Sequence, residues 1–225
     1  MPGLWHPPAM PRALARRLAL AAALPLAACA TAPASSPKVA GAPAPAAGPS
    51  SPPPAPPAPA APSAPLDRAA LEALVASPDR TAEDRALDAG RRPVELLAFY
   101  GVGPGQRVAE LGAADGYTAE LLARAVGPAG TVYAQNSRTL LQILGPRWAA
   151  RLQRPAMRGV VRVDREFQAP LPPEAGGLDL VVMHATYHDL LWLDVDRGAM
   201  LRAVAAALRP GGALVVVDSS ARPGA

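Results

Sequence analysis

Glycine and carboxylate residues gather in the segment Val108–Ala123, whose sequence VAELGAADGYTAELLA is typical of a ligand-binding loop between a strand and a helix. We expect a short buried strand up to Leu111, a turn over Gly112–Gly116, and a helix from Tyr117 with apolar residues at helical spacing. Glycines let the backbone approach a ligand closely, and the first N–H groups of a helix attract an anionic group. The segment therefore predicts a binding site at the carboxyl end of a strand, where open α/β sheets bind ligands.

A histidine beside a carboxylate is the second candidate for chemistry. Histidine is the residue type most often used as a general base, so His188 suits that role or a substrate contact, and Asp189 would then orient it. In the structural alternative, Asp189 caps a turn and His188 packs beside Trp192. Tyr187 likewise either stacks on a planar substrate or covers the loop. We predict no metal site.

Two common glycine loops do not fit the turn. A phosphate-binding P-loop needs Gly-Lys-Ser/Thr before the helix, and this tripeptide is missing. A dinucleotide-binding loop needs three glycines, but the three positions hold Gly112, Ala114 and Tyr117. An oxidoreductase that binds a nicotinamide dinucleotide is therefore disfavoured.

The segments that would position these residues alternate between strands and helices. Besides the strand before the glycine turn, short apolar runs predict strands at Thr131–Ala134, Val160–Val163, Leu178–Met183 and Ala213–Val217. Helices are expected at Thr139–Leu144, Trp148–Leu152 and Asp196–Leu208, the last one broken by Pro210-Gly-Gly212. This alternation predicts an α/β fold with a Rossmann-like, doubly wound sheet of five parallel strands and helices on both faces.

Three helices are expected before the first strand. Apolar residues at helical spacing predict the first over Leu66–Val75. Thr81 can cap the second, which Gly90 would end, and Pro93 suits the first turn of a third helix, Pro93–Tyr100. Such helices would form a lid or a flank of the site.

The glycine turn resembles motif I of the class I S-adenosylmethionine-dependent methyltransferases, Glu-x-Gly-x-Gly-x-Gly, here filled by Glu110, Gly112, Ala114 and Gly116. Leu178–His184 resembles motif IV, and Leu208–Asp218 resembles the Pro-Gly-Gly turn and fifth strand of that family. The resemblance covers residues 82–223 and is strongest for a poorly characterised bacterial branch of predicted methyltransferases that often carry export signals.

The resemblance implies S-adenosylmethionine as cofactor and assigns roles along the strand ends. Gln135 and Asn136 fall where the family binds the ribose hydroxyls, Asp164 where a side chain meets the adenine, and His184 at the pocket wall. His188 and Asp189 would be the catalytic pair. The full set of cofactor-binding residues is Glu110, Gly112, Ala114, Gly116, Tyr117, Gln135, Asn136, Asp164 and His184.

Three departures from the family pattern leave two functions open. Ala114 adds a methyl group where backbone and ligand meet, which is tolerated if its φ stays negative, and Gln135 replaces an acid, at a cost of about 1 kcal/mol in the ribose contact. The family's final antiparallel hairpin has no counterpart after Asp218, so we expect a truncated sequence or another covering of this apolar edge. The chain is then a methyltransferase that acts on an unknown small-molecule or envelope acceptor, or an exported lipoprotein that binds a ligand without catalysis.

The N-terminal residues 1–28 have the pattern of a secretory signal peptide. Three arginines precede the apolar run Leu18–Leu24, which is too short to span a membrane. The sequence Leu-Ala-Ala-Cys, ending at Cys29, resembles a bacterial lipobox, which implies a lipidated cysteine that anchors the protein to the bacterial envelope. Met10 is a possible true start, which would keep the three arginines and the apolar run. The protein would be cytoplasmic if the start site is misassigned. An exported enzyme would need S-adenosylmethionine from an extracytoplasmic source.

Composition separates the remaining chain into a linker and one domain. Residues 30–65 contain 13 prolines in 36 residues and predict a disordered linker, followed by the methyltransferase-like domain at residues 66–225. The formal charge is +4, but three of the 22 basic residues belong to the signal peptide, which leaves 19 basic against 18 acidic residues. This balance gives no reason to expect a nucleic-acid partner. The expected partner is a small-molecule substrate, and the sequence does not indicate an oligomeric state.

Overall fold

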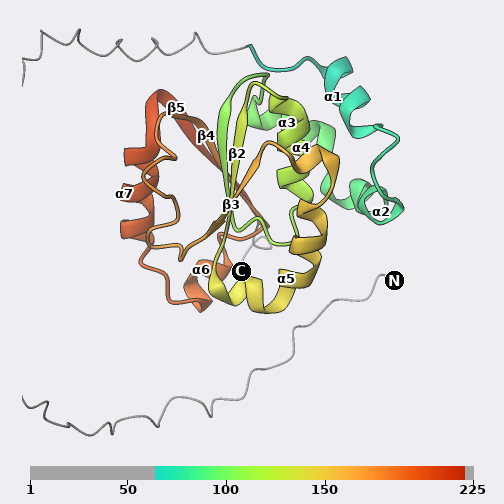
Figure 1. The fold of residues 1–225 in the computed structure, drawn as a ribbon. Helices are drawn as coiled ribbons and strands as arrows, with labels where there is room; N and C mark the ends of the chain where they lie inside the picture. Colours follow the sequence, from blue (N-terminus) through green and yellow to red (C-terminus); the bar gives the residue numbers. More distant parts are fainter. Residues whose placement is uncertain (1–63, 221–225) are drawn as a thin grey trace, which may run out of the picture. The chain divides into compact units, whose positions relative to one another are not determined.

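The computed structural model describes residues 64–220 (Figure 1). The expected signal peptide, the lipobox at Cys29 and all but the last two residues of the linker lie outside the described residues. Five strands form one sheet: β1 Arg107–Leu111, β2 Thr131–Asn136, β3 Val160–Asp164, β4 Leu178–His184 and β5 Leu208–Val217.

The sheet has the strand order β3-β2-β1-β4-β5, and every neighbouring pair is parallel. From β1 the chain first winds outward through β2 to β3 and then returns to the other side of β1 for β4. This reversal places the carboxyl ends of β1 and β4 at a topological switch point, where ligands bind in open α/β sheets. The predicted Rossmann-like fold with five parallel strands is confirmed.

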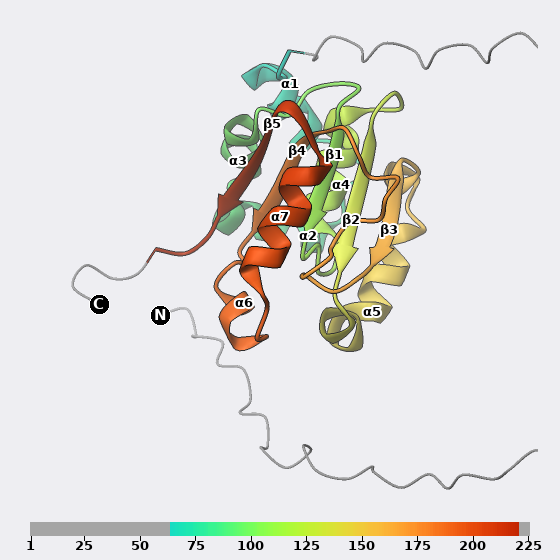
Figure 2. The same cartoon turned by 90° about the vertical axis from the view of Figure 1, so that its left-hand side faces the viewer.

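Helices cover both faces of the sheet, as expected. The helices α4 (Tyr117–Val126) and α5 (Arg138–Leu152) lie on one face, and α7 (Arg197–Ala207) lies on the other (Figures 1 and 2). Successive residues of β1 therefore enter different cores, because side chains alternate along a strand. Val108 packs in the core under α4, whereas Ala109 packs in the core under α7.

Three helices precede the sheet: α1 Arg68–Val75, α2 Ala82–Arg91 and α3 Pro93–Tyr100. The Thr81 hydroxyl accepts a hydrogen bond from the backbone N–H of Asp84 at 3.2 Å, so the predicted cap of α2 is confirmed. The predicted end at Gly90 is wrong by one residue. The helix continues through Gly90 to Arg91, because Arg92 takes the left-handed conformation (φ 48°) that ends it.

Two other boundaries differ from those expected. One helix, α5, replaces the two predicted helices, since Pro146 sits inside it without ending it. Ser137 begins this helix by accepting a hydrogen bond from the N–H of Leu140. The strand β5 begins at Leu208 and runs through Pro210-Gly-Gly212, because an irregular register between β4 and β5 near Leu178 absorbs the turn residues.

The strand β5 pairs with β4 alone within residues 64–220, and Val216 on it is 40% exposed. A short helix, α6 (Asp189–Trp192), follows β4, and a single 3-10 turn, Pro155–Met157, precedes β3. No helix of the described part is long and apolar enough to cross a membrane.

Candidate functional site

A cavity of about 440 Å³ opens at the carboxyl ends of β1 and β4. Four of the predicted cofactor-binding residues line it, namely Glu110, Gly112, Ala114 and His184. The lining also includes residues without a predicted role, from the end of α2, the glycine turn, the start of α4 and the segment after β4: Arg91, Asp115, Thr118, Ala185 and Thr186. The volume lies within the usual range for small-molecule sites.

Glu110 is the most unusual group in this cavity. Its side chain is 3% exposed, and its Oε2 has no hydrogen-bond partner among the described residues. Burial raises the pKa of this carboxyl to about 8, and the Thr118 hydroxyl and the positive charge of Arg91 oppose this shift only in part. A buried polar atom without a partner is costly, so Glu110 is poised for a ligand group that donates a hydrogen bond or carries positive charge.

His184 and Thr118 lie side by side at the wall of the cavity. The hydroxyl of Thr118 is 3.4 Å from Nδ1 of His184. Burial lowers the pKa of His184, and the positive charge of Arg91 lowers it further. His184 is therefore neutral at neutral pH, where its ring can donate one hydrogen bond and accept another.

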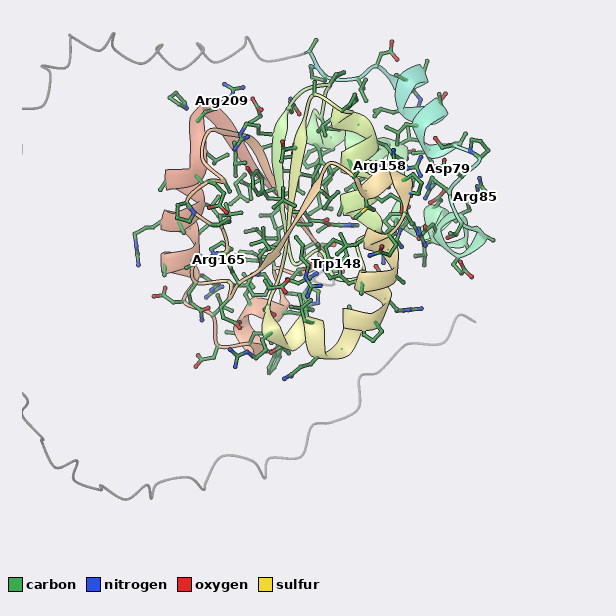
Figure 3. The ribbon with its side chains drawn as sticks, viewed as in Figure 1. Asp79, Arg85, Trp148, Arg158, Arg165 and Arg209 are labelled. Atoms are coloured by element: carbon green, nitrogen blue, oxygen red, sulfur yellow. The ribbon has the colours of Figure 1, made fainter. Side chains whose placement is uncertain are left out.

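The glycines of the turn are required by protein packing. Gly112 has a φ of +72°, and a Cβ at this position would lie 2.6 Å from Cγ2 of Thr186. Gly116 has a φ of +84°, and a Cβ there would overlap the ring of Trp148. Trp148 is fully buried between α5 and the sheet (Figure 3). Gly116 does not line the cavity, so its place in the motif reflects the approach of α5.

The amides at the end of β2 hold the glycine turn. Gln135 accepts a hydrogen bond at Oε1 from the N–H of Gly112 at 3.0 Å. Asn136 accepts one at Oδ1 from the N–H of Ala114 at 2.8 Å and donates one from Nδ2 to the carbonyl of Ala114 at 3.1 Å. Both side chains are buried, and neither lines the cavity. Their predicted contact with a ribose remains a prediction, and in this structure their polar atoms are used by the protein.

Ala114 has a positive φ of 55°. The condition under which we expected this alanine to be tolerated, a negative φ, is therefore not met. The turn keeps the left-handed conformation that a glycine adopts freely, although alanine adopts it at a cost of about 1 kcal/mol. Ala114 still lines the cavity, so its methyl group is part of the site.

Tyr117 and Asp164 lie outside the cavity lining. The hydroxyl of Tyr117 donates to Oδ1 of Asp88 on α2 at 2.6 Å, and the guanidinium of Arg91 lies 4.5 Å from the centre of its ring. Asp164 is exposed and forms an ion pair with Arg162 at 2.7 Å. Tyr117 therefore connects α4 to α2 and orients Arg91 towards the site.

The predicted pair His188 and Asp189 has a third member. Asp218, at the end of β5, accepts hydrogen bonds from the backbone N–H of His188 at 2.9 Å and from its ring Nδ1 at 2.7 Å. The other ring nitrogen, Nε2, lies 3.3 Å from Oδ1 of Asp189. Burial alone would raise the pKa of Asp218, but its hydrogen bonds with His188 and Ser219 lower it. Asp218, which we did not predict, therefore orients the imidazole more directly than Asp189.

Buried ion pairs hold α2 against the sheet-covering helices. Arg151 of α5 contacts Asp84 of α2 at 2.6 Å and Glu120 of α4 at 2.8 Å, and its Nε donates to the carbonyl of Asp115 in the glycine turn. Arg154 contacts the same two carboxylates. Burial would raise the pKa of Asp84, but these two arginines hold it well below its usual range. The helix α2 is therefore fixed as a flank of the site.

No family model matches the chain. Acetylserotonin O-methyltransferase of Mus musculus is 45% identical over 58 residues, which are 26% of this chain and 13% of that protein. The matching protein of Mus musculus molossinus gives the same values. The chain thus spans about 13% of the length of these curated relatives.

Two solved structures are similar to this chain at low identity. An S-adenosylmethionine-dependent methyltransferase from Aquifex aeolicus has a TM-score of 0.49 and 20% identity, with 61% of this chain and 71% of that chain covered. Fibrillarin from Aeropyrum pernix, in complex with S-adenosyl-L-methionine, has a TM-score of 0.40 and 18% identity, with 51% and 46% covered.

Proposed function

We propose that this chain is an S-adenosylmethionine-dependent methyltransferase of the class I type. The observation that carries the proposal is the buried Glu110, which lines the cavity at the switch point of the sheet and whose Oε2 has no hydrogen-bond partner among the described residues. The stretch that is 45% identical to a methyltransferase supports the same function. When bound, S-adenosylmethionine supplies a methyl group that is already activated for transfer.

The residues of the cavity fit this cofactor. Glu110 is placed to receive the positively charged amino group of its methionine part. The helix α4 begins at Tyr117 without a side-chain cap, so its first N–H groups are available to the carboxylate of the same part. His184 and Thr118 add neutral hydrogen-bonding groups at the wall. The chain supplies orientation and a binding cavity for the transfer.

His188 is the proposed general base, with Asp218 and Asp189 around its ring. Asp218 holds Nδ1, which leaves Nε2 for the proton that the acceptor loses when it is methylated. The side chain of His188 is 55% exposed, so an acceptor can reach it. The residues just before it, Ala185 and Thr186, line the cofactor cavity. The acceptor is a small molecule or a component of the bacterial envelope.

Calorimetric titration of the full chain tests cofactor binding. We expect heat with S-adenosylmethionine and with its demethylated product, and weaker binding by Glu110→Gln, which keeps the size of the side chain and removes the acid. A folded protein that gives no heat with either ligand would contradict the proposal. An assay of methyl transfer to an acceptor distinguishes catalysis from ligand binding alone. We expect His188→Ala to lose the transfer and to retain cofactor binding.

We also propose that the protein is exported and anchored through a lipid on Cys29. The lipobox-like sequence that ends at this cysteine supports the proposal. Fractionation of bacteria that express the full chain tests it, with Cys29→Ser as the matched variant. Membrane association that survives this substitution would contradict it.

A further inference from the structure

Ala114 is a residue under backbone strain in the glycine turn. Its φ of 55° lies in the left-handed region, which residues other than glycine, asparagine and aspartate rarely adopt. Such a conformation persists only when the surrounding structure holds it in place. The neighbouring contacts should therefore include the group that does so.

Asn136 is that group. It comes from the end of β2, 22 residues further along the chain, and it is 1% exposed. Its one side-chain amide bonds both backbone groups of Ala114, the N–H at 2.8 Å and the carbonyl at 3.1 Å. An amide can accept from the first and donate to the second, whereas an ionised carboxylate could only accept.

We propose that Asn136 is a positioning residue that holds Ala114 in the left-handed conformation and thereby shapes the glycine turn for its ligand. The alanine in the turn and the amide at the strand end then form one coupled pair. Asn136 acts on the ligand through the backbone of Ala114 and makes no direct ribose contact. Only the choice of S-adenosylmethionine as the probe ligand rests on the function proposed above.

The rest of the turn is held by other partners, which provides a control. Gln135, the residue before Asn136, is equally buried but bonds the N–H of Gly112. A loss of its side chain would disturb the turn without releasing Ala114 from its strained conformation. Gln135→Ala therefore removes a neighbouring buried amide with a different target.

A double-mutant cycle with Ala114→Gly tests the coupling. In the full chain, Asn136→Ala should weaken binding of S-adenosylmethionine on the order of tenfold and lower the melting temperature, because two buried hydrogen bonds are lost. In the Ala114→Gly background the same substitution should cost much less, since glycine adopts a positive φ without strain. Asn136→Asp, which keeps the acceptor and loses the donor, should weaken binding at least as much as Asn136→Ala, because it buries a carboxylate against the carbonyl oxygen of Ala114. Gln135→Ala should cost the same in both backgrounds.

The outcomes separate this inference from the proposed function. Equal loss of binding by Asn136→Ala in the two backgrounds would overturn the inference, because it would assign Asn136 a direct ligand contact. Hydrogen exchange of the turn amides without ligand gives a second readout. Faster exchange in Asn136→Ala, reversed by Ala114→Gly, supports the inference even if wild type does not bind S-adenosylmethionine. If wild type binds S-adenosylmethionine and Asn136→Ala leaves the exchange of the turn amides unchanged, the inference is overturned and the proposed function stands.

Discussion

Asp218 accepts two hydrogen bonds from His188, one from its backbone N–H and one from its ring Nδ1. The two residues are 30 positions apart and meet because β5 ends beside the start of α6. The backbone bond fixes where the residue sits, and the ring bond fixes how the imidazole is turned. Together they leave Nε2 as the nitrogen that faces Asp189.

This relationship predicts a pH-dependent stability. The pKa of Asp218 is lowered in the folded protein, so its ionised form stabilises the fold above the ordinary aspartate pKa, and this stabilisation is lost as the pH falls through the lowered value. We expect Asp218→Asn to lower the free energy of unfolding by about 1 kcal/mol at pH 6 and by less at pH 3. Urea unfolding at the two pH values measures the difference. An equal cost at both would show that the carboxylate charge does not matter.

The contribution of Glu110 to stability should depend on pH in the opposite direction. Its pKa is raised to about 8 in the folded protein, so the fold favours its neutral form. The stabilisation that this raised pKa contributes is fully present below pH 4.5, the pKa of the carboxyl in the unfolded chain. It is lost as the pH rises through about 8, the pKa in the folded protein. We expect Glu110→Gln, which resembles the neutral acid, to remove this loss, so that the variant gains on wild type between pH 5 and pH 9. Parallel stability profiles of the two proteins would contradict the burial of an acid at this position.

Removal of Arg151 should destabilise the fold, because this residue forms buried ion pairs. Arg151→Ala leaves the buried Asp84 with Arg154 as its one arginine partner within residues 64–220, and it frees the carbonyl of Asp115. Glu120 keeps ion pairs with Arg154 and Arg124. We expect a loss of about 3 kcal/mol in the free energy of unfolding, since removal of one partner from a buried ion pair leaves a charge without compensation. Urea unfolding of the full chain measures it.

Arg158 provides the control for this prediction, because its side chain is exposed and its only hydrogen bond within residues 64–220 is made by its backbone. Arg158 lies near α4 and the end of α5 (Figure 3). Arg158→Ala should change stability by less than about 0.5 kcal/mol. Similar small effects of both substitutions would show that the ion pairs do not hold α2.

A side chain at Gly112 should have a steric cost, and a second glycine with a positive φ separates this cost from that of the backbone conformation. Gly112 and Gly177 both have a positive φ, +72° and +67°, but a Cβ would meet Thr186 only at the first position and nothing within 4 Å at the second. Gly177→Ala should cost about 1 kcal/mol from its positive φ alone. Gly112→Ala should cost at least about 1 kcal/mol more and should weaken cofactor binding. Melting temperatures and calorimetry compare them, and equal costs would exclude the contact with Thr186.

Much of the fold follows from local sequence patterns. The five strands are short apolar runs between turn residues, so their number, approximate positions and parallel pairing could be predicted. The boundaries that failed depend on tertiary context. Pro210-Gly-Gly212 is typical of a break, but β5 continues through these residues because it pairs with β4. Pro146 is typical of a helix end, but α5 continues across it.

The candidate site was only partly predictable. Glu110, Gly112, Ala114 and His184 line the cavity because the motif and the strand ends place them there. The helices before β1 were expected to flank or cover the site, but no local pattern indicates that Arg91 is the residue of α2 that lines the cavity. The partners of Asn136 and His188 lie 22 and 30 residues away in sequence, and only the folded chain brings them together.

The binding of S-adenosylmethionine to the full chain tests the central claim most directly. Calorimetric titration should give saturable binding at one site per chain, with binding weakened by Glu110→Gln and unchanged by Arg158→Ala. The protein should also bind the demethylated product, because Glu110 and the start of α4 recognise the part that both ligands share. A folded protein that binds neither ligand would contradict the assignment of this cavity to S-adenosylmethionine.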